Sequence, residues 1–126
     1  MADRIKKVSK AHIRYKDSNG KNVPGATTIT GLLNKPFLIT WANRLGLEGI
    51  DSTKYRDEAA EIGTLAHAMI QAHVQGEELD TSTFSQAQID QAENAVISYF
   101  EWEKQHSVEP ILCETPMVSD SYGYGG

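Results

Sequence analysis

Residues 55–69 read YRDEAAEIGTLAHAM and carry apolar side chains at helical spacing. One face of a helix would collect five of them at steps of four, three, four and three residues: Tyr55, Ala59, Ile62, Ala66 and Met69. Such a stripe is typical of an amphipathic helix that packs on a core. The pattern predicts a long helix that begins near Asp51 or Ser52, ends near Gly76 and turns this face inward.

Upstream of this helix the sequence predicts a hairpin and two shorter helices. Residues 11–23 alternate in polarity around the turn Asp17-Ser18-Asn19-Gly20, which indicates a β-hairpin. Thr27 or Thr28 is expected to cap a short helix that runs through Leu33. Pro36 is expected to begin a second helix, because its missing N–H would be unpaired there anyway, and Gly46 to end it.

Downstream, Ser85 and Gln88 have the spacing of a capping box, which predicts the start of another long helix. Its expected apolar face consists of Ile89, Ala92, Val96, Tyr99 and Phe100. Residues 111–118 are predicted to form a strand with Ile111, Cys113 and Met117 on its inner side. Residues 119–126 resemble a turn into a further strand that does not arrive, so we expect the chain to stop mid-sheet.

Together these elements predict an α/β fold of the α+β kind. It would consist of an amino-terminal hairpin, three to four helices, two of them long and amphipathic, and a later core strand. We expect residues 1–10 to be a basic tail and residues 11–126 to be one domain. This sheet is thin for two long helices, because isolated sheets of two or three strands are marginally stable.

Composition narrows the class of protein. The formal net charge is −5, but residues 1–60 hold 11 basic and 6 acidic side chains, whereas residues 61–126 hold 1 and 11. The amino end could therefore meet a polyanion, and a solubilising tail is the plainer explanation. The single cysteine excludes an internal disulfide framework and a multi-cysteine zinc site. No transmembrane helix or secretory signal fits the sequence, so we expect no membrane partner and a cytoplasmic protein.

Two positions on the long helix are candidates for a site. Gly63 and His67 are four residues apart and share a face. A glycine weakens a helix, and is more readily tolerated where something must approach the backbone closely. An imidazole one turn later could bind metal or phosphate. The alternative is a histidine that donates a hydrogen bond within the core.

Glu114 is the third candidate, because it lies within the otherwise apolar predicted strand. A carboxylate there must be paired, metal-bound or turned to solvent. The usual signatures of phosphate loops, serine hydrolases, zinc proteases and dinucleotide-binding proteins are missing from the sequence. The spacing of the histidines does not suit zinc either.

Four short segments occur in an order that resembles the PD-(D/E)xK nucleases. They are Val23-Pro24-Gly25-Ala26-Thr27-Thr28-Ile29, Gly63-Thr64-Leu65-Ala66-His67, Leu112-Cys113-Glu114-Thr115-Pro116 and Tyr124-Gly125-Gly126. The order is most similar to that of the RecB-like exonuclease branch, which includes phage and CRISPR-associated members. The resemblance spans residues 11–126. It implies a restriction-endonuclease-like core, Mg²⁺ or Mn²⁺, and cleavage of DNA phosphodiester bonds.

Transferred to this sequence, the resemblance makes His67 and Glu114 catalytic and metal-binding residues. Gly125-Gly126 matches the turn before the family's catalytic Asp, but that Asp and the later Asp/Glu-x-Lys are not in the chain. The core would thus be incomplete. We therefore expect the chain to be the amino-terminal part of a Mg²⁺-dependent exonuclease of phage or prophage recombination or repair. It should be inactive alone. Its expected partners are DNA and a recombination protein, in the cytoplasm of a bacterial host cell.

Arg14, Lys16, Lys35, Trp41 and Gly63 are the expected DNA contacts, although the apolar neighbours of Trp41 favour a place in the core. Two alternatives remain open. One is a non-catalytic module whose basic hairpin binds nucleic acid or an acidic partner. The other is a helical interaction protein whose strand around Glu114 completes another chain's sheet.

Overall fold

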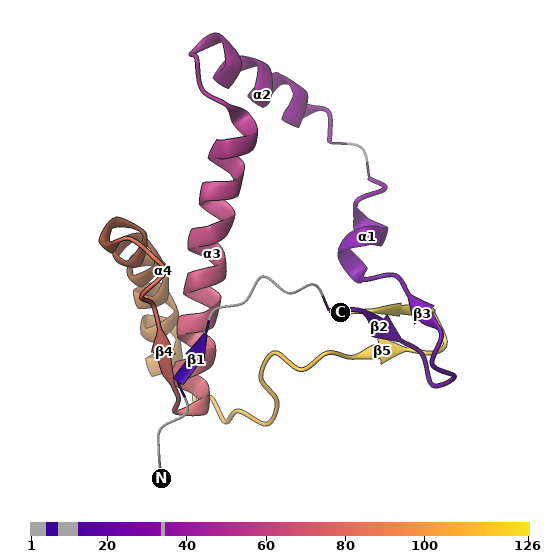
Figure 1. Cartoon of the computed structure of the whole chain (residues 1–126). Coiled ribbons are helices and arrows are strands. Elements are labelled where there is room, and N and C mark those ends of the chain that lie inside the picture. Colours follow the sequence, from indigo (N-terminus) through magenta and orange to yellow (C-terminus); the bar gives the residue numbers. More distant parts are fainter. Residues whose placement is uncertain (1–4, 8–12, 34) are drawn as a thin grey trace. The chain divides into compact units, whose positions relative to one another are not determined.

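A computed structural model describes residues 5–7, 13–33 and 35–126, and the chain divides into two units (Figure 1). We call residues 51–113, with a short strand near the amino terminus, the helical unit. Residues 13–50 and 114–126 form the hairpin unit. Helices and short strands occur together, which confirms the α+β class. The restriction-endonuclease-like core stays a prediction.

The helical unit is built on the predicted long helix, α3 (Ser52–Gln75). The Asp51 side chain caps it by accepting from the backbone N–H groups of Thr53 and Lys54, which satisfies two of the four N–H groups that a helix start leaves unpaired. Gly76 ends the helix in the left-handed conformation, at φ 66°. Both ends lie where the sequence predicted them.

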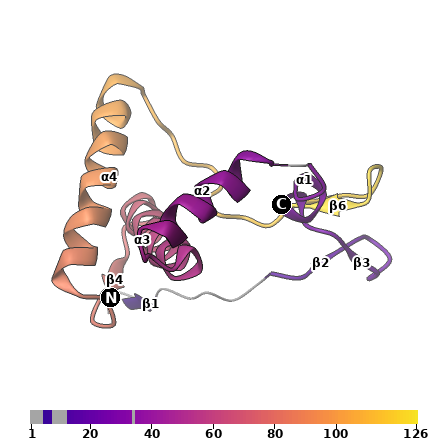
Figure 2. The ribbon, with the colours of Figure 1, turned by 90° about the horizontal axis from the view of Figure 1, so that it is seen from above.

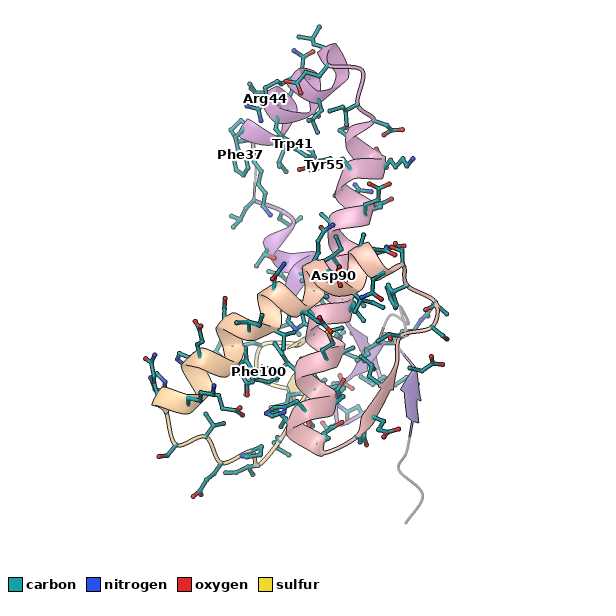
Figure 3. The ribbon with its side chains drawn as sticks, turned by 90° about the vertical axis from the view of Figure 1, so that its left-hand side faces the viewer. Phe37, Trp41, Arg44, Tyr55, Asp90 and Phe100 are labelled. Atoms are coloured by element: carbon teal, nitrogen blue, oxygen red, sulfur yellow. The ribbon has the colours of Figure 1, made fainter. Side chains whose placement is uncertain are left out.

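The second long helix, α4 (Gln86–Gln105), packs against α3 (Figures 1 and 2). Its predicted capping box is present, because Ser85 accepts from the Gln88 backbone N–H while the Gln88 side chain accepts from that of Ser85. The core between the two helices is formed by Leu65, Ala66, Ala92 and Val96, with Ile62, Met69, Ile70, Leu79, Phe84, Ile89 and Phe100 packed around them. Figure 3 shows Phe100 on α4.

The predicted inward stripe of α3 is correct only in its second half. Ile62, Ala66 and Met69 belong to the core, whereas Tyr55 and Ala59 are exposed, with Tyr55 at 52%. The buried residues of α4 pack against α3 only from Ile62 onward. Helical periodicity identifies an apolar face, but it does not say how much of that face finds a partner.

A parallel strand pair that the sequence did not predict completes this unit. β1 (Ile5–Lys7) pairs with β4 (Glu78–Asp80), with Ile5 opposite Glu78. The basic tail expected over residues 1–10 is therefore partly a strand, and its other positions lie outside the described residues. A parallel pair joins segments that are distant in sequence, so local pattern does not reveal it.

The hairpin unit contains the predicted hairpin, formed by β2 (Tyr15–Lys16) and β3 (Asn22–Val23). One carboxylate oxygen of Asp17 accepts from the backbone N–H groups of Asn19 and Lys21, which fixes the turn. Gly20 takes the positive φ that this turn needs. The prediction also included Ala11 and His12, which lie outside the described residues.

Two short helices follow the hairpin, and their ends differ from the prediction. α1 (Ala26–Thr30) has Gly25 as its N-cap with no side-chain cap, so neither Thr27 nor Thr28 caps it, and Leu32 and Leu33 lie exposed beyond it. α2 (Phe37–Leu47) starts one residue after Pro36 and continues through Gly46. Gly46 does not end α2, because a glycine inside a helix weakens it without ending it. The chain turns instead at Gly49, which has φ 76°.

The predicted strand at residues 111–118 is wrong. Glu114 has φ 47°, a left-handed conformation that an extended strand cannot contain. The expected inner residues Ile111 and Met117 are exposed, at 92% and 58%. Backbone pairing begins at Met117, which exchanges two hydrogen bonds with Gly126, and continues in β5 (Val118–Ser119), which a turn joins to an antiparallel β6 (Tyr124–Gly125). The further strand expected to be missing is thus present as β6.

The described strands form three separate two-stranded sheets, not one core sheet. A parallel bridge between Gly25 and Gly125 links the hairpin region to β6. None of the described helices combines the length and the apolar character needed to cross a bilayer.

Candidate functional site

Gly63 and His67 lie on α3 as predicted, one turn apart on the same face. A Cβ added at Gly63 would meet no described atom within 4 Å outside the helix's own nearby backbone. The space beside this glycine is therefore open. The His67 side chain is exposed, between the buried Ala66 and the half-buried Ala68. The alternative, a histidine that donates a hydrogen bond within the core, stays open.

The neighbouring histidine of α3 has a clear structural role and gives a useful comparison. His73 Nε2 lies 3.0 Å from Glu103 Oε2 on α4, and its ring meets the Phe100 ring edge-on at 4.6 Å. The Tyr99 hydroxyl donates to the other Glu103 oxygen at 3.3 Å. Burial, and then the Glu103 carboxylate, raise the pKa of Tyr99 above its usual value. His73 thus joins α3 to α4.

Glu114 lies in the hairpin unit, in an irregular exposed segment before β5. Its exposure shows only that this carboxylate is not buried. His67 belongs to the helical unit. The meeting of His67 and Glu114 at one divalent ion therefore stays a prediction.

The described residues alone do not complete a site for Mg²⁺. No three His, Cys, Asp or Glu side chains within residues 5–7, 13–33 and 35–126 gather closely enough to hold a metal ion. Mg²⁺ requires nearly octahedral coordination, mostly by oxygen. His67 and Glu114 are two candidate ligands, too few for octahedral coordination, so the described part of the chain does not fit the ion by itself.

The residues expected to contact DNA differ in their surroundings. Arg14, Lys16 and Lys35 are exposed. Trp41 on α2 is half-buried (Figure 3). It is less buried than the core position that its apolar neighbours favoured, and less exposed than a ring that stacks on a base would be. Arg14 and Lys16 lie on the hairpin, whereas Gly63 belongs to the helical unit.

Tyr15 and Gly125 hold the hairpin unit together. Gly125 is buried in β6, and its N–H donates to the Pro24 carbonyl at 2.9 Å. The Tyr15 ring lies directly over Gly125, so close that a Cβ there would be 2.6 Å from the Tyr15 Cβ and nearer still to the ring. Two of the segments that carry the family resemblance, around Pro24 and around Gly125, are therefore in contact.

A groove of about 550 Å³ lies beside the hairpin. Its lining combines polar and apolar residues from the hairpin and from α1: Ile13, Arg14, Tyr15, Asn22, Val23, Pro24, Gly25, Thr27 and Thr28. Among the polar ones, only Arg14 was predicted as a DNA contact. Strand alternation could have added Asn22, but the approach of α1 to the hairpin has no local signal.

Comparisons with known proteins do not assign the chain to a family. No family model, curated protein sequence or solved structure matches it.

Proposed function

We propose that this chain is the amino-terminal part of a Mg²⁺-dependent DNA exonuclease of the RecB-like PD-(D/E)xK branch. The observation that carries the proposal is the open face of α3, where exposed His67 follows Gly63 by one turn with nothing described beside the glycine. A helical glycine costs about 1 kcal/mol relative to alanine. An approaching substrate or metal-bound group gives this cost a reason, and the order of the four sequence segments agrees with it.

In this proposal the chain contributes only part of the catalytic centre. His67 and Glu114 would each offer one ligand, and the family's Asp and Asp/Glu-x-Lys would follow Gly126 in a longer polypeptide. Without the missing carboxylates too few ligands would fix the ion, so the 126-residue chain should not cleave DNA.

The test compares this chain with a longer polypeptide that continues past Gly126 and contains Asp and Asp/Glu-x-Lys. Both are incubated with linear DNA and Mg²⁺, and release of nucleotides is measured. Only the longer polypeptide should be active. Activity of the short chain, or none in the longer one, would contradict the proposal.

Two histidine variants of the longer polypeptide test the role of His67. His67→Ala should lower activity at least about tenfold, since loss of even an outer contact to a metal ligand commonly costs 10- to 100-fold. His73→Ala is the matched control, because it removes an exposed imidazole from the same helix. It should lower the melting temperature through the lost Glu103 contact while largely retaining activity. Equal losses of activity in the two variants would refute the assignment.

A further inference from the structure

Charge is divided unequally between the two units. Residues 51–113 of the helical unit contain 12 acidic and 3 basic side chains. β1 adds Lys6 and Lys7 to the helical unit, whereas residues 13–50 and 114–126 of the hairpin unit contain 5 basic and 4 acidic side chains. A polyanion is therefore repelled less by the hairpin unit than by the helical unit. The hairpin unit is therefore the part of the chain to search for a nucleic-acid contact.

The hairpin itself has one polar face and one packed face. Side chains alternate along a strand, so Arg14 and Lys16 share a side, and the register places Asn22 directly opposite Lys16 on that same side. All three are exposed. Tyr15 and Val23, which are also paired, are half-buried on the other side, where Tyr15 covers Gly125.

The groove beside this hairpin is lined by Arg14 and by neutral hydrogen-bonding groups, and Lys16 lies next to it on β2. Thr27 and Thr28 contribute exposed hydroxyl-bearing side chains, and Asn22 contributes an amide. None of the nine lining residues is acidic. The nearest carboxylate in sequence, Asp17, accepts two backbone hydrogen bonds of 2.9 Å within its own turn. Arginine, lysine, threonine and asparagine are the side chains that usually contact phosphate and sugar oxygens.

We propose that this groove binds the sugar–phosphate backbone of a single DNA strand. Arg14 within the groove and Lys16 beside it on β2 pair with phosphates, and Asn22, Thr27 and Thr28 donate hydrogen bonds to phosphate or sugar oxygens. A volume of about 550 Å³ has the size of a pocket for a small ligand, which corresponds to a short piece of one strand and not to a duplex. The inference rests on the proposed function for the choice of DNA, but it needs no metal.

The experiment measures binding of the full 126-residue chain to a labelled oligo(dT) of about 12 nucleotides, a typical length for single-strand sites. Fluorescence anisotropy is recorded in EDTA over a series of salt concentrations. Each phosphate contact to a single strand contributes about −0.7 to the slope of log K against log salt. The double variant Arg14→Gln/Lys16→Gln should therefore bind more weakly and make that slope less negative by about 1.4.

A charge-matched control separates this site from a general effect of charge. Lys54→Gln/Arg56→Gln removes the same two charges from exposed positions at the start of α3, and it should leave the slope unchanged. The double variant Thr27→Val/Thr28→Val should weaken binding without altering the slope, because it removes hydrogen-bond donors and no charge. Circular dichroism spectra verify that each variant is folded.

Three results would overturn the inference: an unchanged slope in Arg14→Gln/Lys16→Gln, an equal change in the control, or inorganic polyphosphate that competes as well as oligo(dT) at equal charge. The last result would mean that the groove recognises phosphate charge alone. Because the measurement uses EDTA and the short chain, it stays informative if the longer polypeptide proves inactive. Conversely, an active nuclease whose hairpin variants bind normally would refute only the groove.

Discussion

Gly125→Ala should destabilise the hairpin unit strongly, because the space for a methyl group is occupied by Tyr15. The new Cβ would lie 2.6 Å from the Tyr15 Cβ and would overlap the first ring atoms. These atoms belong to the base of the side chain, which β2 holds in place, so a change of rotamer alone does not relieve the overlap. The strand or β6 must shift.

The size of the effect follows from two losses. Overpacking of a buried position costs about 1–3 kcal/mol. A shift of β6 also weakens the 2.9 Å hydrogen bond from the Gly125 N–H to the Pro24 carbonyl, worth about 1 kcal/mol. We therefore expect the free energy of unfolding to fall by about 2–4 kcal/mol, a large part of the 5–15 kcal/mol typical of whole domains.

Urea unfolding followed by tryptophan fluorescence measures this loss. The chain has two tryptophans, Trp41 in the hairpin unit and Trp102 in the helical unit. A Trp102→Phe background therefore makes the signal report on the hairpin unit. Gly46→Ala is the control, since a Cβ there meets nothing within 4 Å, and it should stabilise α2 by up to about 1 kcal/mol.

A double-mutant cycle tests the physical cause. In a Tyr15→Ala background, Gly125→Ala should cost at least about 1 kcal/mol less than in the native background, because the overlapping ring is gone. A Gly125→Ala protein within about 0.5 kcal/mol of wild type, or a cost that Tyr15→Ala leaves unchanged, would refute the contact between the two residues.

Three further changes test the helical unit. Asp51→Ala should lower the free energy of unfolding by about 1 kcal/mol through loss of the α3 cap, and an unchanged urea midpoint would argue against the cap. Gly63→Ala should raise the free energy of unfolding by up to about 1 kcal/mol and lower the nuclease activity of the longer polypeptide. A stabilised variant with full activity would contradict a role of the open face of α3 in catalysis. Burial and Glu103 raise the pKa of Tyr99 in the folded protein, so the neutral hydroxyl contributes to the stability of the fold. This contribution is complete below the pKa that Tyr99 has in the unfolded chain, and it is lost as pH rises through the pKa that it has in the folded protein. Melting temperatures above about pH 10 should thus fall less steeply in Tyr99→Phe than in wild type, and parallel curves would contradict this.

The long helices could be predicted because their signals are local. Asp51 and Gly76 mark the ends of α3, and Ser85 with Gln88 marks the start of α4, each through hydrogen bonds or backbone angles within a few residues. The hairpin turn at Asp17 is predictable for the same reason. Exposure is different, since Tyr55 and Ile62 share one stripe, yet only Ile62 meets the core.

The strands depended on partners that the local sequence does not specify. Residues 111–118 alternate like a strand, but Glu114 is left-handed, and pairing with residues 124–126 starts only at Met117. In contrast, the short β4 has no distinctive pattern and forms because β1, distant in sequence, pairs with it. Pairing across such distances depends on the whole chain, and alternation alone cannot supply it.

The candidate site was predictable to a similar extent. The spacing of Gly63 and His67 placed them on one helical face, and this could be read from the sequence. That His67 is exposed, and that no described atom fills the space beside Gly63, depends on how α4 packs and could not be read from α3 alone.

The division of charge gives the two proposed activities separate physical requirements. The helical unit has 12 acidic and 3 basic side chains in residues 51–113, and β1 adds Lys6 and Lys7, so a DNA strand that reaches His67 must meet an excess of negative charge. The hairpin unit presents Arg14 and Lys16 on an exposed face and can bind the strand without a cation. Salt should therefore weaken the contact made by the hairpin, while chelation of Mg²⁺ should abolish a reaction at His67 and leave that contact intact.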